Sequence, residues 1–315
     1  MEDAGAASVR RRDAVHGVAF ALAAYGFWGV VPAYWKLVDH VPAPEILAHR
    51  VLWTLLGTVL LLAVAGRSAE LRATLRSGPR LLTLTLSAFL IGSNWGVFLW
   101  AVIHERLLEA SLGYYLNPLV NVVLGRLFLG ERLSRPAWAA VALAGAGVGI
   151  LALGHGGLPW VSLYLAVTFA LYGLVRKLAP VRPLVGLTVE TALLTPLSAA
   201  YLVFLAWEGG GSFAGNDATS ALLVGGGLVT AFPLLCFVSA ARRLWLATLG
   251  LFQYIAPSLT FLLAVAVYHE PFAAGQAFAF LSIWIALALY SADALRPTRR
   301  ATKSPTAQQA ETERR

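Results

Sequence analysis

Two residues of opposite charge lie inside long apolar stretches, Arg50 in the first half of the chain and Glu190 in the second. Segment 42–50 aligns with segment 182–190, so the two charges occupy matching depths. A charge in membrane hydrocarbon costs several kcal/mol unless it is paired or hydrated, which makes each a candidate functional residue. Arg50 could bind an anionic group, and Glu190 a cationic group or a proton. Each also lies close to the start of its stretch, so pairing with a loop or reaching to the interface is the alternative.

Two prolines, Pro118 and Pro257, fall near the centres of two further apolar stretches. Each removes a backbone donor and frees a carbonyl one turn earlier. Kinked helices with free backbone groups are typical ligand sites in secondary transporters; a structural kink, with amide side chains joining helices, is the alternative. The residues predicted to line a solute site are Arg50, Asn94, Trp95, Tyr114, Asn117, Pro118, Asn121, Glu190, Gln253, Tyr254 and Pro257.

The composition is that of a membrane protein with no metal or cofactor site. Of 315 residues, 58% are hydrophobic and 13% are charged, about half the charge of a soluble chain. The single cysteine, Cys236, excludes an intramolecular disulfide, and the six histidines lack metal-ligand spacing. The net charge of +8 comes from basic residues between apolar stretches, where they act as topology signals and do not indicate nucleic-acid binding.

These residues must be positioned by transmembrane helices, because only helices and closed barrels span lipid. The polar alternation of barrel strands is absent. Apolar stretches separated by proline and glycine clusters predict an all-α fold of ten transmembrane helices, at 17–38, 45–65, 80–103, 110–129, 135–154, 159–178, 184–207, 219–240, 247–268 and 272–291.

Lysine and arginine residues concentrate in the tails and in every second connection between these stretches. Positively charged loops face the cytoplasm, so both termini are predicted to be cytoplasmic in a multi-pass protein of the inner (plasma) membrane. Segment 1–16 is then a cytoplasmic N-terminal segment. The polar tail 296–315 lacks apolar periodicity and is predicted to be disordered.

The two halves of the chain are similar in sequence. ASLG (110–113) matches ATLG (247–250), and the interval from Pro118 to Glu131 equals that from Pro257 to Glu270. Since each unit contains five helices, an odd number, the second unit must enter the membrane from the opposite side. Two inverted five-helix repeats are therefore predicted, at 17–154 and 159–291, an architecture typical of secondary transporters.

The motifs themselves resemble the RarD branch of the EamA transporters, in the drug/metabolite transporter superfamily. The resemblance implies ten helices, inverted repeats and export of metabolites by alternating access. It covers roughly residues 17–295 and is carried by SNW (93–95), EASLGYYLNPLVN (109–121), FLGER (128–132), LYGLVRK (171–177), ET (190–191), YIAP (254–257) and HEP (269–271).

The leading hypothesis is a secondary transporter that exports a small metabolite or drug-like solute. Its expected partners are that small-molecule solute, the lipid bilayer and a coupling proton or ion; a homodimer is compatible with the sequence. A non-transporting membrane sensor or scaffold is the alternative. A membrane enzyme acting on lipid is disfavoured, since it would need clustered carboxylates or histidines and only Glu45 with His49 comes near this.

Overall fold

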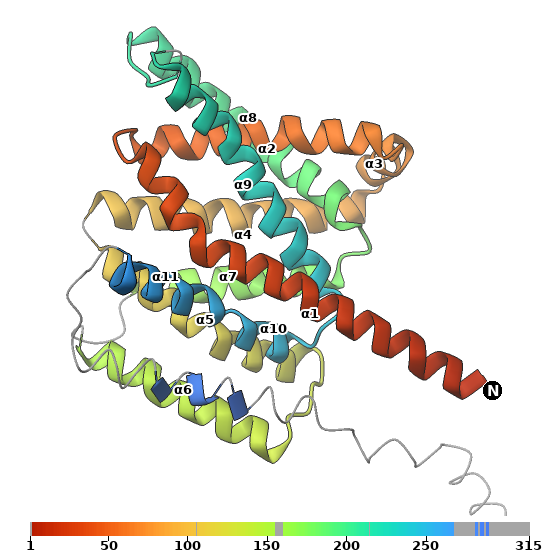
Figure 1. Ribbon diagram of the computed structural model, residues 1–315. Helices are drawn as coiled ribbons and strands as arrows, with labels where there is room; N and C mark the ends of the chain where they lie inside the picture. Colours follow the sequence, from red (N-terminus) through yellow and green to blue (C-terminus); the bar gives the residue numbers. More distant parts are fainter. Residues whose placement is uncertain are drawn as a thin grey trace, which may run out of the picture.

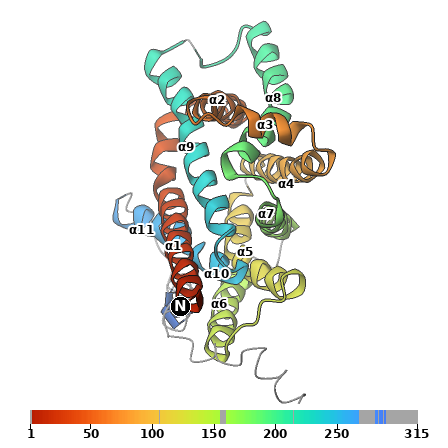
Figure 2. The ribbon, with the colours of Figure 1, turned by 90° about the vertical axis from the view of Figure 1, so that its right-hand side faces the viewer.

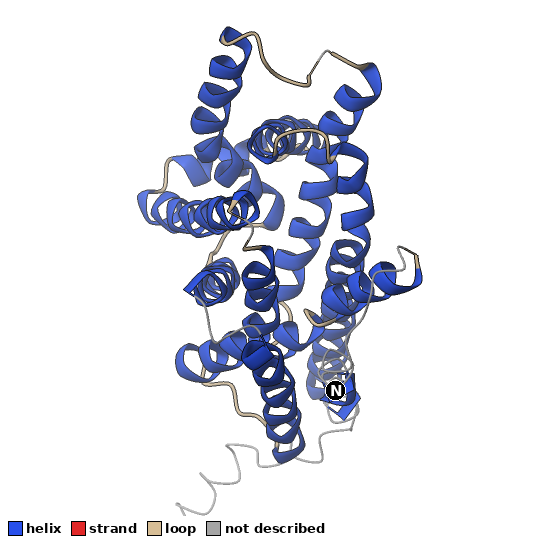
Figure 3. Cartoon of the chain, turned by 90° about the vertical axis from the view of Figure 1, so that its left-hand side faces the viewer, coloured by secondary structure: helices blue, strands red, loops and turns tan. Residues whose placement is uncertain are grey.

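The computed structural model describes most of the chain, and every regular element in the described residues is a helix (Figure 3). This confirms the all-α prediction. The described residues are 2–104, 106–154, 160–213, 215–267, 281–282, 284–286 and 288–289.

Twelve helical elements follow one another in the described residues (Figure 1). Helices α1, α2, α4, α7, α8 and α9 are long and apolar enough to cross a membrane. The elements are α1 (Glu2–Trp35), η1 (Lys36–Val38), α2 (Ala43–Val64), α3 (Ser68–Leu75), α4 (Gly78–Ile103), α5 (Leu107–Phe128), α6 (Arg135–Gly154), α7 (Trp160–Leu178), α8 (Pro183–Trp207), α9 (Asp217–Ala241), α10 (Leu246–Phe252) and α11 (Ile255–Ala266).

The first eight predicted stretches each coincide with one helix. The ninth, 247–268, is divided into α10 and α11, and the short helix α3 lies in a connection for which no helix was predicted. Helix α1 also continues back through the N-terminal segment to Glu2. The tenth stretch, 272–291, falls mostly outside the described residues, and the tail 296–315 falls wholly outside them.

The helices of the two halves are interleaved. Figure 2 shows α2 end-on between α8 and α9, and α2 contacts both. Helix α1 packs on α9 and α11, and α7 packs on α4 and α5. Helices α5 and α10 also pack against each other. Each half therefore completes its core with helices from the other.

An aromatic cluster fills the contact between α1, α7 and α9. The ring centres of Tyr25 and Phe237 lie 6.2 Å apart, and those of Tyr172 and Phe237 lie 6.0 Å apart. Trp28 and Phe169 add a further edge-on pair at 5.9 Å. Edge-on and offset ring pairs at such distances stabilise a core beyond their buried area.

Basic connections gather at one end of the bundle. Arg182, before α8, pairs with Glu70 of α3 at 3.6 Å. Arg242, after α9, donates a hydrogen bond to the carbonyl of Val181 in the α7–α8 connection. The connections between α2 and α4, between α7 and α8 and between α9 and α10 are therefore neighbours in space.

Connections with few basic residues meet at the other end. Glu45, at the start of α2, accepts hydrogen bonds from the backbone N–H groups of Ser212 (2.6 Å) and Phe213 (3.3 Å), in the α8–α9 connection. Trp100, near the end of α4, contacts Trp160 at the start of α7, with ring centres 5.2 Å apart. The helices thus run alternately between two ends that differ in charge.

The two predicted proline kinks differ in outcome. Pro257 cannot donate to the carbonyl of Gln253, which instead accepts the N–H of Ala256 at 3.2 Å, and the helix is interrupted there. Pro118 lies inside the unbroken helix α5. A Cβ on Gly250 of α10 would lie 3.0 Å from the carbonyl oxygen of Pro118, so the two helices cross in close contact at these positions.

Candidate functional site

Arg50 lies where α2 meets α1, α4 and α9. Its Nε donates to Oγ1 of Thr230 on α9 at 2.9 Å. The guanidinium carbon lies 5.0 Å from the ring centre of Trp35 and 5.3 Å from that of Trp95, within the range of a cation–π interaction. Tyr114 of α5, another predicted site residue, lies against Phe98 of α4, with ring centres 6.0 Å apart. Within the described part of the chain, no carboxylate lies at ion-pair distance from Arg50.

Three consecutive glycines on α9 bring the other helices close to Arg50. A Cβ on Gly226 would lie 3.4 Å from the Trp35 ring and 3.6 Å from Cγ of Arg50. A Cβ on Gly227 would lie only 2.5 Å from the backbone carbonyl carbon of Trp53 on α2. Small residues allow such close approach of membrane helices. The glycines therefore place the end of α1 and the side chain of Arg50 in one layer against α9.

Two of the three asparagines of the predicted site bond to a neighbouring helix, and the third bonds within its own helix. Asn94 donates to Oγ1 of Thr168 at 2.9 Å, and Asn117 donates to the carbonyl of Ala166 at 2.7 Å, both on α7. Asn121 donates to Oδ1 of Asn117 at 2.8 Å. All three asparagines are buried. The bonds of Asn94 and Asn117 match the helix-joining role that the sequence left as the alternative.

The predicted residues at the α10–α11 break lie around the second proline. Tyr254 is buried and donates its hydroxyl to the carbonyl of Tyr115 on α5 at 3.2 Å. Gln253 is also buried, and its Oε1 has no hydrogen-bond partner among the described residues. Pro118 is buried and Pro257 is partly buried. The break thus presents one free buried acceptor, which Arg50 does not contact.

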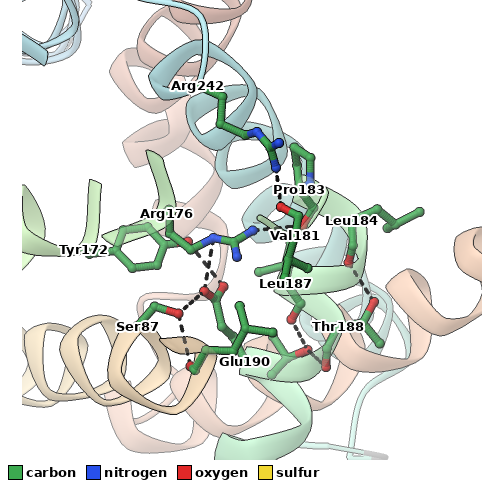
Figure 4. Close-up of polar contacts among 12 residues, drawn as sticks. Ser87, Tyr172, Arg176, Val181, Pro183, Leu184, Leu187, Thr188, Glu190 and Arg242 are labelled. Atoms are coloured by element: carbon green, nitrogen blue, oxygen red, sulfur yellow. Dashed lines mark hydrogen bonds and ion pairs between the residues drawn. The ribbon is translucent and has the colours of Figure 1, made fainter. Parts of the chain in front are cut away.

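Glu190 lies in a separate polar cluster formed by α4, α7 and α8 (Figure 4). Its Oε1 lies 3.2 Å from Nε of Arg176 and accepts a hydrogen bond from Ser87 at 2.5 Å. Its Oε2 accepts the hydroxyl of Tyr172 at 3.4 Å. Arg176 is 0% exposed and Glu190 is 1% exposed, so the ion pair is excluded from solvent.

Gly186 makes room for this ion pair. A Cβ at Gly186 would overlap the guanidinium group of Arg176, so any side chain there would displace it. Arg176 also donates from Nη2 to the carbonyl of Pro183 at 3.4 Å. The structure therefore pairs Glu190 locally with Arg176 and does not bring it to Arg50, although the two charges lie at matching positions in the sequence.

Glu131, in the connection between α5 and α6, joins the first half of the chain to the second. Its carboxylate accepts the backbone N–H of Leu246 at 2.6 Å and that of Ala247 at 3.1 Å, at the start of α10. Nearby, Lys177 donates to the carbonyl of Ala241 at 2.9 Å, at the end of α9. A carboxylate is stabilising where the first N–H groups of a helix lack partners.

Replacing Glu131 by glutamine is expected to lower the free energy of unfolding by about 1–2 kcal/mol, because the amide loses both the charge and one of two acceptors at the helix start. Thermal unfolding in detergent would measure the loss. Glu208→Gln, at an exposed position after α8, is the matched control and should leave the Tm unchanged. Equal Tm values for both variants would show that the Glu131 contacts add no stability.

Sequence reasoning missed five residues of these two sites: Trp35, Ser87, Tyr172, Arg176 and Thr230. The glycine triplet 225–227 was an available signal for a close helix contact, and Thr230 follows it by one turn of α9. Arg176 ends an apolar stretch, where a basic residue is typical of a topology signal, and it is part of the motif LYGLVRK (171–177). Its pairing with Glu190 depends on how α7 and α8 pack.

A bundle of long apolar helices that encloses two charged clusters defines a multi-pass α-helical membrane protein. Residues 15–153 match the EamA-like transporter family. The chain is 47% identical to Protein RarD of Escherichia coli (strain K12), over 91% of this chain and 97% of that protein. It is 49% identical to Protein RarD of Salmonella typhi, over 89% and 95% of the two chains.

The chain therefore belongs to the EamA-like transporter family and is of the RarD type. Among solved structures, it resembles a crystal structure with a TM-score of 0.69, over 89% of this chain and 98% of that chain, at 19% sequence identity. That likeness concerns the fold alone.

Proposed function

We propose that this protein is a secondary transporter that exports a small metabolite or drug-like solute by alternating access, driven by a proton or ion gradient. The observation that carries the proposal is the position of Arg50. Helices of both halves surround it, and no carboxylate of the described residues neutralises it. A charge kept in this way inside a membrane bundle favours a ligand site over a purely structural role.

We further propose ten helices arranged as two inverted repeats, 17–154 and 159–291. The packing supports this, because matched helices exchange partners. Helix α1 packs on α9 where its counterpart α7 packs on α4, and α5 packs on α7 where α11 packs on α1. The contacts of α2 with α8 and of α5 with α10 join counterparts directly. Such an arrangement allows two similar halves to exchange conformations around one site.

The charge distribution supports an orientation with both termini in the cytoplasm and the protein in the inner (plasma) membrane. The basic connections share one end of the bundle, shown by the Arg182–Glu70 pair and the Arg242–Val181 bond. Positively charged loops stay on the cytoplasmic side. Reporter tags at Arg126, near the basic end of α5, and in the α8–α9 connection should report opposite compartments.

One prediction distinguishes the transporter from the alternative function, a sensor or scaffold without transport. Arg50→Gln is expected to reduce solute export at least tenfold without loss of folded protein, because the variant removes the charge that faces the solute. Untargeted metabolomics of the medium would compare cells that overproduce the wild type, Arg50→Gln or Arg126→Gln. Arg126 is exposed on α5 and serves as the matched control.

A wild type that changes no extracellular metabolite, although folded in the membrane, would favour the scaffold. If Arg50→Gln exports solute at the level of the wild type, Arg50 has a structural role and does not bind the solute.

A further inference from the structure

We propose that the solute binds to Arg50 through a single carboxylate, so that the transported class is an organic monocarboxylate with an apolar body. This inference rests on the proposed transport function and specifies which solutes reach the site. It is carried by three features around Arg50: the one hydrogen bond that it makes within the described residues, the aromatic faces beside it and the single positive charge.

The hydrogen bond leaves the outer edge of the guanidinium available. Arg50 uses Nε for Thr230, and its two Nη atoms make no hydrogen bond within the described residues, so they remain as a pair of donors. No carboxylate of the described residues reaches these atoms. A planar guanidinium binds a planar carboxylate through two parallel hydrogen bonds, which is the strongest arrangement open to it. A carboxylate would therefore accept hydrogen bonds from the two Nη donors that the protein leaves free.

The other cluster shows how the same chain satisfies a buried arginine when no ligand is needed. Arg176 has Glu190 at 3.2 Å and the carbonyl of Pro183 at 3.4 Å. An uncompensated buried charge is strongly destabilising, and an internal counter-charge is the usual remedy. Arg50, which is only partly buried, occupies the sequence position that matches Glu190 but has no counter-charge within the described residues. The missing counter-charge is the part that the solute supplies.

The aromatic side chains around Arg50 favour a solute whose remaining part is apolar. Trp35 and Trp95 present ring faces at 5.0 and 5.3 Å from the guanidinium carbon. Tyr114 contacts Phe98, with ring centres 6.0 Å apart. One guanidinium balances one carboxylate, whereas a phosphate dianion would leave a net negative charge among these apolar groups. An organic acid with an apolar body therefore fits better than a phosphate ester.

The test uses the full chain in detergent and measures binding by the change in Tm and by quenching of tryptophan fluorescence. The probes are benzoate, phenylacetate and cinnamate, each compared with its neutral amide. We expect at least one acid to stabilise the wild type while its amide does not. Phenyl phosphate, which has the same ring and a second charge, should bind more weakly than the acid.

Three variants connect the binding to the geometry. Arg50→Gln should weaken the acid about tenfold to hundredfold, because a charge-assisted hydrogen-bonded pair is lost. Arg50→Lys, which keeps the charge but not the planar fork, should recover only part of the affinity. Thr230→Val should weaken it less, since Thr230 only positions the group. Arg126→Gln, at an exposed position, should bind like the wild type.

The inference is overturned if the acids and their amides bind equally, or if Arg50→Gln keeps the preference for the acids. It is also overturned if phenyl phosphate is preferred. Failure of the transport proposal gives a different pattern, in which the acids bind through Arg50 but the metabolomics comparison shows no export. Export of neutral solutes that is independent of Arg50 would leave transport standing and remove the carboxylate site.

Discussion

Arg176→Met is expected to lower the free energy of unfolding by about 3–5 kcal/mol, because it leaves the buried carboxylate of Glu190 without its counter-charge. Ser87 and Tyr172 would still donate to that carboxylate, but neither supplies a positive charge. Thermal and denaturant unfolding in detergent would measure the loss.

Two comparison variants make this result specific. Arg176→Met combined with Glu190→Gln removes both charges and keeps an acceptor for Ser87, so most of the lost stability should return. Arg182→Met removes an arginine from a more exposed pair with Glu70, 3.6 Å away, in which Arg182 is 59% exposed. An exposed pair contributes about 0–1 kcal/mol. If Arg176→Met and Arg182→Met lower the free energy of unfolding equally, the buried Arg176–Glu190 pair contributes no more stability than the exposed Arg182–Glu70 pair.

The double variant also separates the two roles open to Glu190. If Glu190 only supports the fold through Arg176, the double variant should export solute like the wild type once the amount of folded protein is equal. If Glu190 carries a coupled proton or a cationic group, export should stay low although the stability is restored. The metabolomics comparison used for Arg50 gives this readout directly.

Gly227→Val is expected to destabilise the protein by about 1–3 kcal/mol or more through overpacking. Even a Cβ at this position would lie 2.5 Å from the carbonyl carbon of Trp53 and 2.8 Å from the backbone nitrogen of Thr54. Backbone atoms cannot rotate away, so α2 and α9 must separate. The hydrogen bond from Thr54 to the carbonyl of Gly227, now 3.0 Å, would be strained as well.

The same variant should also weaken the carboxylate site, because separating α2 from α9 moves Arg50 away from Thr230. The readouts are the Tm in detergent and the affinity for the acids. Gly57→Val, on α2 where a Cβ would meet nothing within 4 Å, is the matched control and should change neither. Normal acid binding by Gly227→Val would mean that the close crossing of α2 and α9 does not position Arg50.

Much of the fold could be predicted from the sequence, because the membrane imposes a local rule. A stretch that crosses lipid must be apolar over about 20 residues and must satisfy its backbone internally, and both properties depend on neighbouring residues in the chain. The eight stretches that precede residue 241 were located for this reason, each with one helix in the structure. The interruption at Pro257 also followed from local geometry, since the missing N–H leaves the carbonyl of Gln253 to accept from Ala256 instead.

The partners of the charged residues were decided only by the tertiary structure. Local patterns placed Arg50 and Glu190 at matching depths, and from those patterns the two were equal candidates. The packing of α7 against α4, and of α4 against α8, gives Glu190 an arginine, whereas α1, α4 and α9 give Arg50 aromatic faces and one hydroxyl. Burial and pairing depend on how whole helices pack, so the sequence determined which charges lie in apolar stretches and the packing of helices determined which of them has an internal counter-charge.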